Sequence, residues 1–262
     1  DRSVNMPLSY LPTDFPNYTA HLLVQKHCFT IMPDLQLPTA SAPKHSANPE
    51  LLVIANPFAE AEFMPGYFKQ TQFRAGGIFL PLPFTEVEAA AIKALYPKTQ
   101  VLKRRHATSR TLKTIASDYD IIHLATHAFA DSSFDIFSGL VLHASQDSLD
   151  DGFLMGYEIE QLRLNCELVT LSACETAAGD DRAALGLAGV ALKAGARSAL
   201  ATLWEVDDSA TLELVQAFYA QLAAGDTSKA RSLQLAQIKL IGQQGNKHPS
   251  KWAPFLLIGN WL

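Results

Sequence analysis

The sequence has few of the features that mark metal-binding, secreted or membrane proteins. Only three of its 262 residues are cysteines, Cys28, Cys166 and Cys174. Their number is odd, no CxxC pair occurs, and their spacing fits neither a metal site nor a disulfide framework. No apolar run approaches the roughly 20 residues that a membrane-spanning helix needs. These absences predict a protein of a reducing compartment, the cytoplasm, without a membrane span.

Strong charge of one sign is also missing. The chain carries 21 basic and 26 acidic residues, a net charge of −5, and the two signs are interspersed. Without a basic field, nucleic acid is not an expected direct partner. The hydrophobic share of 48% and the charged share of 18% are typical of a globular core and exclude a disordered chain. The mild acidity is compatible with a basic peptide substrate but does not require one.

The chain begins Asp1-Arg2-Ser3-Val4, with neither an initiator methionine nor the layout of a signal peptide. We therefore expect an excised piece of a longer protein. Residues 1–50 are irregular and rich in proline, and we interpret them as an N-terminal flanking segment with a short strand or hairpin and a loop. The domain itself is predicted to span residues 51–262.

From residue 51 onward, predicted strands and helices alternate. The pair Thr85 and Glu88 has the spacing of a capping box, which predicts a helix that begins there. The alternation predicts an α/β fold with a mainly parallel central sheet and helices on both faces. Strands are expected at 51–56, 99–102, 121–127, 139–143, 168–174, 198–203 and 255–258. Helices are expected at 85–96, 109–117, 157–162, 183–195, 208–224 and 227–241.

Two of these apolar runs end in a reactive side chain. One ends at His127 and the other at Cys174, and the histidine comes first by 47 residues. Open α/β sheets place their chemistry at the carboxyl ends of their strands. Caspase-type cysteine proteases have this order and about this spacing. The pair is therefore a candidate base and nucleophile of a thiol hydrolase.

Each residue also has a simpler interpretation. Cys174 could be a buried structural cysteine, because buried thiols are common, and His127 could be a histidine of a surface loop. His123 lies inside its run and is interpreted as a core histidine with satisfied hydrogen bonds. Cys28 and Cys166 are interpreted as structural. The residues alone make the pair plausible without deciding between these alternatives.

Four segments together resemble the CHAT domain, a family of caspase-like peptidases often fused to tetratricopeptide repeats. They are IHLATH (122–127), LSACET (171–176), the stretch 186–208 and WAPFLLIG (252–259). The resemblance implies a caspase-hemoglobinase fold with His127 and Cys174 as a catalytic dyad. It also implies a bacterial, cytosolic cysteine endopeptidase acting on a protein substrate. Such an enzyme would be the effector part of a larger regulated protein with a repeat sensor or activating partner, in defence or signalling.

The family usually has a glycine after the histidine, where this chain has Ala128. The resemblance assigns the backbone N–H groups of Ala128 and Cys174 to the oxyanion, and alanine keeps that donor provided that its φ is not positive. No third catalytic residue is evident beside the dyad, and a thiol nucleophile does not require one. No metal or organic cofactor is expected.

Three carboxylates are candidates for a pocket that accepts a basic side chain, namely Glu175, Asp207 and Asp208. Asp207 or Asp208 could instead cap the helix that follows. Two other classes of function stay open. The domain could be a catalytically silent scaffold or interaction module, since a fold does not fix a function. A flavodoxin-like ligand binder is disfavoured, because no glycine-rich phosphate loop follows the first strand.

Overall fold

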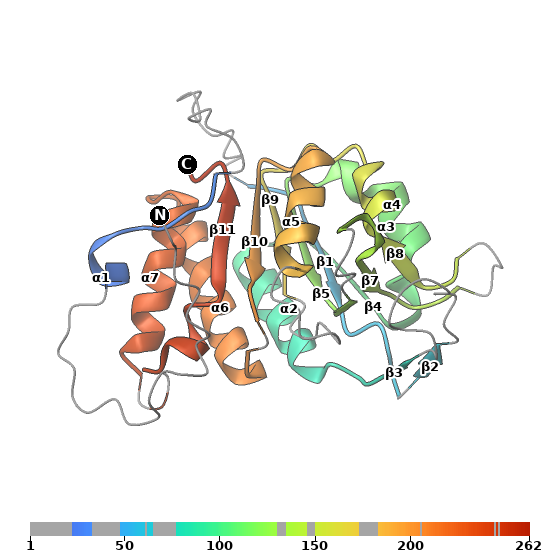
Figure 1. Ribbon diagram of the computed structural model, residues 1–262, viewed down its shortest axis with the longest axis horizontal. Coiled ribbons are helices and arrows are strands. Elements are labelled where there is room, and N and C mark those ends of the chain that lie inside the picture. Colours follow the sequence, from blue (N-terminus) through green and yellow to red (C-terminus); the bar gives the residue numbers. More distant parts are fainter. Residues whose placement is uncertain are drawn as a thin grey trace, which may run out of the picture.

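A computed structural model shows how the chain folds (Figure 1). It describes residues 23–32, 48–60, 62–64, 77–129, 135–145, 150–172, 183–204, 206–243, 245 and 247–262. The helices are α1 (Leu23–Lys26), α2 (Pro83–Leu95), α3 (Ser109–Ile115), α4 (Gly156–Glu160), α5 (Ala183–Lys193), α6 (Asp208–Ala224) and α7 (Lys229–Ile241). The strands are β1 (Leu51–Ala55), β2 (Glu62–Met64), β3 (Gly77–Phe79), β4 (Thr99–Lys103), β5 (Ile121–Ala125), β6 (His127–Phe129), β7 (Gly139–Val141), β8 (Phe153–Met155), β9 (Leu168–Leu171), β10 (Ser198–Thr202) and β11 (Phe255–Gly259).

Six strands form the central sheet, in the order β11-β10-β9-β5-β1-β4. The pairs β10–β9, β9–β5, β5–β1 and β1–β4 are parallel, and only β11 runs antiparallel to its neighbour β10. The mainly parallel α/β sheet predicted from the alternating pattern is thus confirmed. No described helix has the length and apolar character that crossing a membrane requires.

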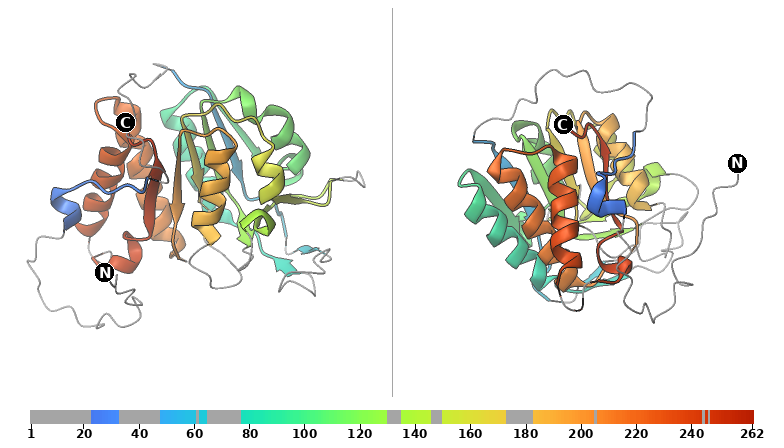
Figure 2. Two further views of the ribbon diagram at one scale, coloured as in Figure 1. Left: turned by 45° about the horizontal axis from the view of Figure 1, so that its top comes forward. Right: turned by 90° about the vertical axis from the view of Figure 1, so that its left-hand side faces the viewer.

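Two helical layers cover the sheet, one on each face (Figure 2). Helices α2, α6 and α7 form one layer, and α3, α4 and α5 form the other. Successive residues of a strand point to opposite faces. In β1, Leu52 and Ile54 join the core under α3–α5, whereas Leu51, Val53 and Ala55 join the core under α2, α6 and α7. Burial on both faces explains why these strands are continuous apolar runs in the sequence.

The expected strands at 121–127 and 139–143 differ from the structure. The first ends at Ala125 as β5, and after Thr126 the chain enters β6, which pairs antiparallel with β7 and not with the central sheet. β7 pairs in turn with β8, so these strands form a separate antiparallel sheet. The Thr126 hydroxyl donates to the Val141 carbonyl oxygen across the break. Periodicity cannot show such a break, since both strands are apolar and buried.

The predicted capping box is wrong. Helix α2 begins at Pro83, two residues earlier than expected, and Leu82 occupies the N-cap position without a side-chain hydrogen bond. Proline suits the first turn of a helix, because its missing N–H would have no partner there. Thr85 and Glu88 therefore lie within the helix, and both side chains are buried.

The described part of the N-terminal segment packs against the domain. Residues 23–26 form a short helix, where a strand or hairpin was expected, and Val24 is buried in the core under α2, α6 and α7. The Ile31 backbone pairs with β11, donating to the Leu257 carbonyl and accepting from the Gly259 N–H, both at 2.9 Å. This pairing covers the outer edge of β11. The division of the chain at residue 50 stays a prediction.

Candidate active site

The strands β1, β5 and β9 end at the same edge of the sheet, because they are parallel neighbours. His127 stands at this edge, two residues after the end of β5. β9 lies beside β5, and the Ser172 N–H extends the ladder by donating to the Leu124 carbonyl at 2.9 Å. The predicted adjacency of the two strands is confirmed. Cys174 and Glu175 follow β9 but lie outside the described residues, so their roles stay predictions.

His127 is buried at this edge among aromatic rings and a backbone carbonyl. Its side chain lies beside Phe79, at a ring-centroid distance of 5.3 Å, and beside Phe58, at 6.1 Å. Its Nε2 atom lies 2.7 Å from the carbonyl oxygen of Leu80. The two rings and the carbonyl come from segments far from His127 in the sequence, and together they restrict how the imidazole can turn.

The Leu80 carbonyl decides which nitrogen of His127 carries the proton. A carbonyl oxygen only accepts hydrogen bonds, so Nε2 must be the donor. In the neutral imidazole the acceptor lone pair then belongs to Nδ1. The Leu80 carbonyl thus orients the ring of His127. The sequence could not reveal it, because every residue type has a backbone carbonyl.

A polar network at the end of β1 holds the segment that contains Leu80. Asn56, which has a positive φ of 39°, accepts a hydrogen bond from the Leu82 N–H and donates one to Glu86, both at 2.7 Å. Asparagine is one of the few residues that adopt this backbone conformation readily. The Arg104 side chain donates to the carbonyl of Phe58 at 3.2 Å. The same network therefore fixes both segments that contact His127.

Glu86 is the charged centre of that network. It accepts a hydrogen bond from Lys103 at 2.7 Å and also forms an ion pair with Arg104. The hydrogen bond from Lys103, then that from Asn56 and the two positive charges, lower the pKa of Glu86 to about 2 against the opposing effect of burial. Glu86 is therefore ionised at neutral pH and ties α2 to the ends of β1 and β4.

The backbone of Ala128 is not in the left-handed region. It is buried in β6 opposite Leu140, and the only described non-glycine residues with a positive φ are Asn56 and Arg104. Alanine in place of the family's usual glycine therefore introduces no strain at this position. Its assignment to the oxyanion stays a prediction.

Asp207 is the N-cap of α6. Its carboxylate accepts a hydrogen bond from the Ala210 N–H at 3.2 Å, and this bond, followed by the charge of Lys251 at 3.5 Å, lowers its pKa. The sequence left open whether Asp207 caps this helix, and the hydrogen bond to Ala210 shows that it does. Asp208 lies in the first turn of the same helix. A role of either residue in substrate binding stays a prediction.

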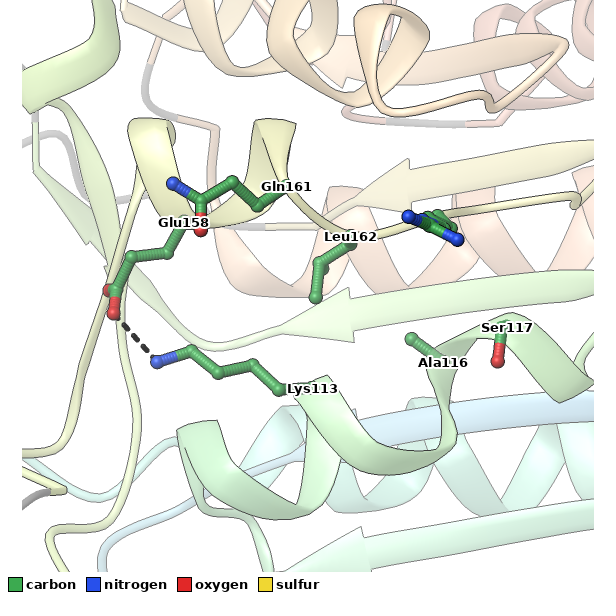
Figure 3. A pocket seen from close by; sticks show the side chains of 7 residues that line it. Lys113, Ala116, Ser117, Glu158, Gln161 and Leu162 are labelled. Atoms are coloured by element: carbon green, nitrogen blue, oxygen red, sulfur yellow. Dashed lines mark hydrogen bonds and ion pairs between the residues drawn. The ribbon is translucent and has the colours of Figure 1, made fainter.

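Two of the cavities among the described residues lie away from His127. One of about 420 Å³ lies between α3 and α4, where Lys113 forms an ion pair with Glu158 at 2.7 Å (Figure 3). The other, of about 360 Å³, lies where β5 and β9 begin and includes Asp120 and Glu167. Neither cavity includes His127, so neither belongs to this site.

Solved structures with a similar fold include a cysteine proteinase. The Arg-specific cysteine proteinase gingipain R matches with a TM-score of 0.52 and 10% identity over 81% of this chain and 46% of its own. The complex of Porphyromonas gingivalis RgpB pro- and mature domains matches with a TM-score of 0.51 and 11% identity over 81% and 47%. At such low identity these matches show the fold alone, which is the caspase-like α/β fold expected from the sequence.

Similarity in sequence connects the chain to repeat proteins. Tetratricopeptide repeat protein 28 of Mus musculus is 29% identical over 213 residues, which cover 69% of this chain and 9% of the relative. Its Homo sapiens counterpart is 27% identical over 218 residues, which cover 69% and 8%. The chain thus spans less than a tenth of the length of these relatives. The CHAT domain itself matches residues 4–260, almost the whole sequence, and the protein therefore belongs to the CHAT domain family.

Proposed function

We propose that this domain is a cysteine endopeptidase that hydrolyses peptide bonds of a protein substrate through His127 and Cys174. The observation that carries the proposal is the placement of His127. It stands at the carboxyl edge of β5, its Nε2 is held by the Leu80 carbonyl, and the adjacent strand β9 leads to Cys174 within two residues of Ser172. A nucleophile, a base and a group that orients the base are the parts such a site needs.

In the proposed reaction, Nδ1 of His127 takes the thiol proton of Cys174, and the thiolate attacks the carbonyl carbon of the scissile bond. The proton then passes to the leaving amine as the C–N bond breaks, which leaves an acyl group on sulfur. Water, deprotonated by His127, releases that acyl group. The backbone N–H groups of Ala128 and Cys174 are proposed to hold the oxyanion, and each such donor typically lowers the barrier by about 3 kcal/mol.

For the substrate, we propose a basic side chain on the residue before the scissile bond. Glu175, Asp207 and Asp208 supply negative charge near the carboxyl edge in this proposal. The described structure supports an ionised Asp207, because the helix cap and Lys251 lower its pKa. The name of gingipain R states specificity for arginine, which makes arginyl peptides a sensible first substrate to test.

We also propose that the domain acts as the effector part of a longer, cytoplasmic protein under the control of tetratricopeptide repeats or of an activating partner. The support is the name of the mammalian relatives and the small share of their length that this chain spans. Bacterial origin and a role in defence or signalling stay predictions.

The test is the rate of alkylation of Cys174 by iodoacetamide between pH 5 and pH 9. A Cys28→Ser background is used, because Cys28 is exposed and would also react. Cys166 can remain, because it is buried and burial raises the pKa of its thiol to about 12. We expect fast alkylation that persists below pH 7, disappears in Cys174→Ala and loses its low-pH component in His127→Ala. Cleavage of an arginyl peptide should be lost in both variants.

Two results would contradict the proposal. One is alkylation of Cys174 at the rate of an ordinary thiol that is indifferent to His127→Ala, both in the domain and in the longer protein with its partner. The other is an activated thiol that cleaves no peptide in any of these forms. Either result would favour the catalytically silent scaffold that the sequence also allows.

A further inference from the structure

A buried polar cluster lies between the sheet and the helices α2 and α6. None of its residues takes part in the proposed reaction. Its members are Glu88 of α2, His123 of β5, Thr170 of β9 and Tyr219 of α6, and none is more than 2% exposed. The helices α2 and α6 cover one face of the sheet (Figure 2), and the four side chains contact one another between these helices and the strands β5 and β9. The rings of Tyr96 and Phe218 pack against Tyr219.

The contacts of the cluster join two neighbouring strands through a helix. His123 and Thr170 are directly paired in the parallel ladder of β5 and β9. The Tyr219 hydroxyl is hydrogen-bonded to both, at 3.1 Å from His123 Nδ1 and 3.0 Å from Thr170 Oγ1. On the other side of the ring, His123 Nε2 lies 2.9 Å from a Glu88 carboxylate oxygen.

Such a cluster is a costly way to fill a core. Buried polar groups lose their hydration, and well-packed apolar residues are often at least as stabilising. What such a cluster can provide is specificity, because the hydrogen bonds of a buried network form in one arrangement of the strands and helices only. If β5 and β9 slipped by one residue, His123 and Thr170 would no longer be paired and Tyr219 could not contact both.

The pair that the cluster ties together leads directly to the candidate dyad. His127 follows His123 by four residues, and Cys174 follows Thr170 by four residues. Beyond the pair the ladder continues through Leu124, whose carbonyl accepts the N–H of Ser172. The relative position of the two strand ends therefore depends on the register of β5 and β9.

We propose that Tyr219, through Thr170 and His123, is a positioning residue that locks the register of β5 and β9 and so sets the approach of Cys174 to His127. The inference rests on the proposed function, since it concerns the same dyad. Burial raises the pKa of Tyr219, so its hydroxyl stays protonated in the working range of the enzyme. The effect of Tyr219 on the strand register does not depend on whether the thiol of Cys174 is activated.

The first variant is Tyr219→Phe, which removes one oxygen atom and keeps the ring contacts with Tyr96 and Phe218. Its matched control is Tyr96→Phe, because Tyr96 is also buried and its hydroxyl forms no hydrogen bond with the described residues. We expect Tyr219→Phe to slow the alkylation of Cys174 about tenfold at pH 6, since small misplacements of reacting groups cost one to two orders of magnitude. Above pH 9, where the thiol ionises unaided, its rate should equal that of the parent.

Variants of Thr170 test the hydrogen bond with Tyr219 from its other partner. Thr170→Val removes the hydroxyl at nearly constant volume and should also slow alkylation at pH 6, by no more than Tyr219→Phe, because the contact of Tyr219 with His123 remains. Thr170→Ser keeps the hydroxyl and should retain the parent profile. The double variant Tyr219→Phe/Thr170→Val should be no worse than Tyr219→Phe, because Tyr219→Phe already removes the contact with Thr170. A residue with a merely structural role would lower the melting temperature without changing the pH profile of the folded protein.

Hydrogen exchange gives a readout that does not depend on the thiol. The Ser172 N–H should exchange faster in Tyr219→Phe and in Thr170→Val, and not in Tyr96→Phe. An unchanged Ser172 exchange rate together with an unchanged alkylation profile would overturn the positioning role while leaving the proposed function intact. An ordinary thiol both in the domain and in the longer protein with its partner would overturn the proposed function, and the exchange of Ser172 would then decide the locked register by itself.

Discussion

Two histidines four residues apart show how differently the interior of the sheet and its carboxyl edge are built. His123 lies within β5 and is contacted by the side chains of Glu88 and Tyr219, one at each ring nitrogen. His127 begins β6, and its Nε2 contacts a backbone carbonyl while two phenylalanine rings flank its ring. Both histidines are buried, so burial alone does not distinguish the structural residue from the candidate base.

The difference lies in what each ring nitrogen meets. At His123, Nδ1 is hydrogen-bonded to the Tyr219 hydroxyl, and Nε2 lies 2.9 Å from a Glu88 carboxylate oxygen without hydrogen-bond geometry. At His127, the carbonyl of Leu80 takes one nitrogen and assigns the acceptor lone pair to the other. The interior is thus stabilised by side chains of two helices, and the edge by loops that the network of Asn56 and Glu86 holds in place.

The largest effect on stability is expected when the buried contact between Glu88 and His123 is removed. Glu88→Ala leaves His123 buried without its carboxylate, and removal of one partner from a buried pair costs about 3–5 kcal/mol. Urea unfolding measures this change. The double variant Glu88→Met/His123→Leu should recover most of the loss, because it removes both polar groups. A single variant within about 1 kcal/mol of the parent would show that the contact contributes little.

A smaller effect is expected at the edge, in Asn56→Ala. This variant loses the hydrogen bonds to Leu82 and Glu86 and places alanine at a φ of 39°, for a cost of about 2 kcal/mol. Asn56→Gly loses the same hydrogen bonds without backbone strain and should be about 1 kcal/mol more stable than Asn56→Ala. Unlike Glu88→Ala, both variants should shift the imidazole NMR signals of His127. Unshifted signals would mean that Asn56 does not hold the Leu80 segment.

The contribution of Glu86 to the free energy of unfolding should fall at acidic pH. The pKa of Glu86 is about 2 in the folded protein and about 4.5 when unperturbed. Its stabilising contribution is therefore fully present above about pH 4.5 and is lost as the pH falls towards 2. The stability difference between the parent and Glu86→Gln, measured by urea unfolding, should shrink across this window. A difference that stays constant from pH 6 to pH 2.5 would exclude the ionised network.

The smallest effect concerns Asp207, whose two roles can be separated. Asp207→Ala removes the N-cap of α6 and should cost about 1 kcal/mol, whereas Asp207→Asn keeps the cap and should cost almost nothing. Both variants remove the charge, so the preference for arginyl over uncharged peptides should fall equally in both if that charge selects the substrate. An unchanged preference in Asp207→Asn would restrict Asp207 to its structural role.

The candidate site was only partly visible in the sequence. The run ending at His127 and the run leading to Cys174 predict neighbouring strands, and β5 and β9 confirm this. Leu80 was not identifiable, because a hydrogen bond to a backbone carbonyl leaves no mark on residue type. Glu88 was interpreted as a capping residue from its spacing to Thr85, because local spacing carries no information about His123, 35 residues further on.

The sequence by itself determined the family, the alternation that produces a mainly parallel sheet, and the edge at which His127 stands, since each is encoded in local patterns of apolar and reactive residues. Only the tertiary structure decided that β5 stops at Ala125, that Leu80 fixes the tautomer of His127, and that Tyr219 joins His123 to Thr170. These features depend on contacts between residues far apart in the chain, and such contacts form only when the helices and strands pack together.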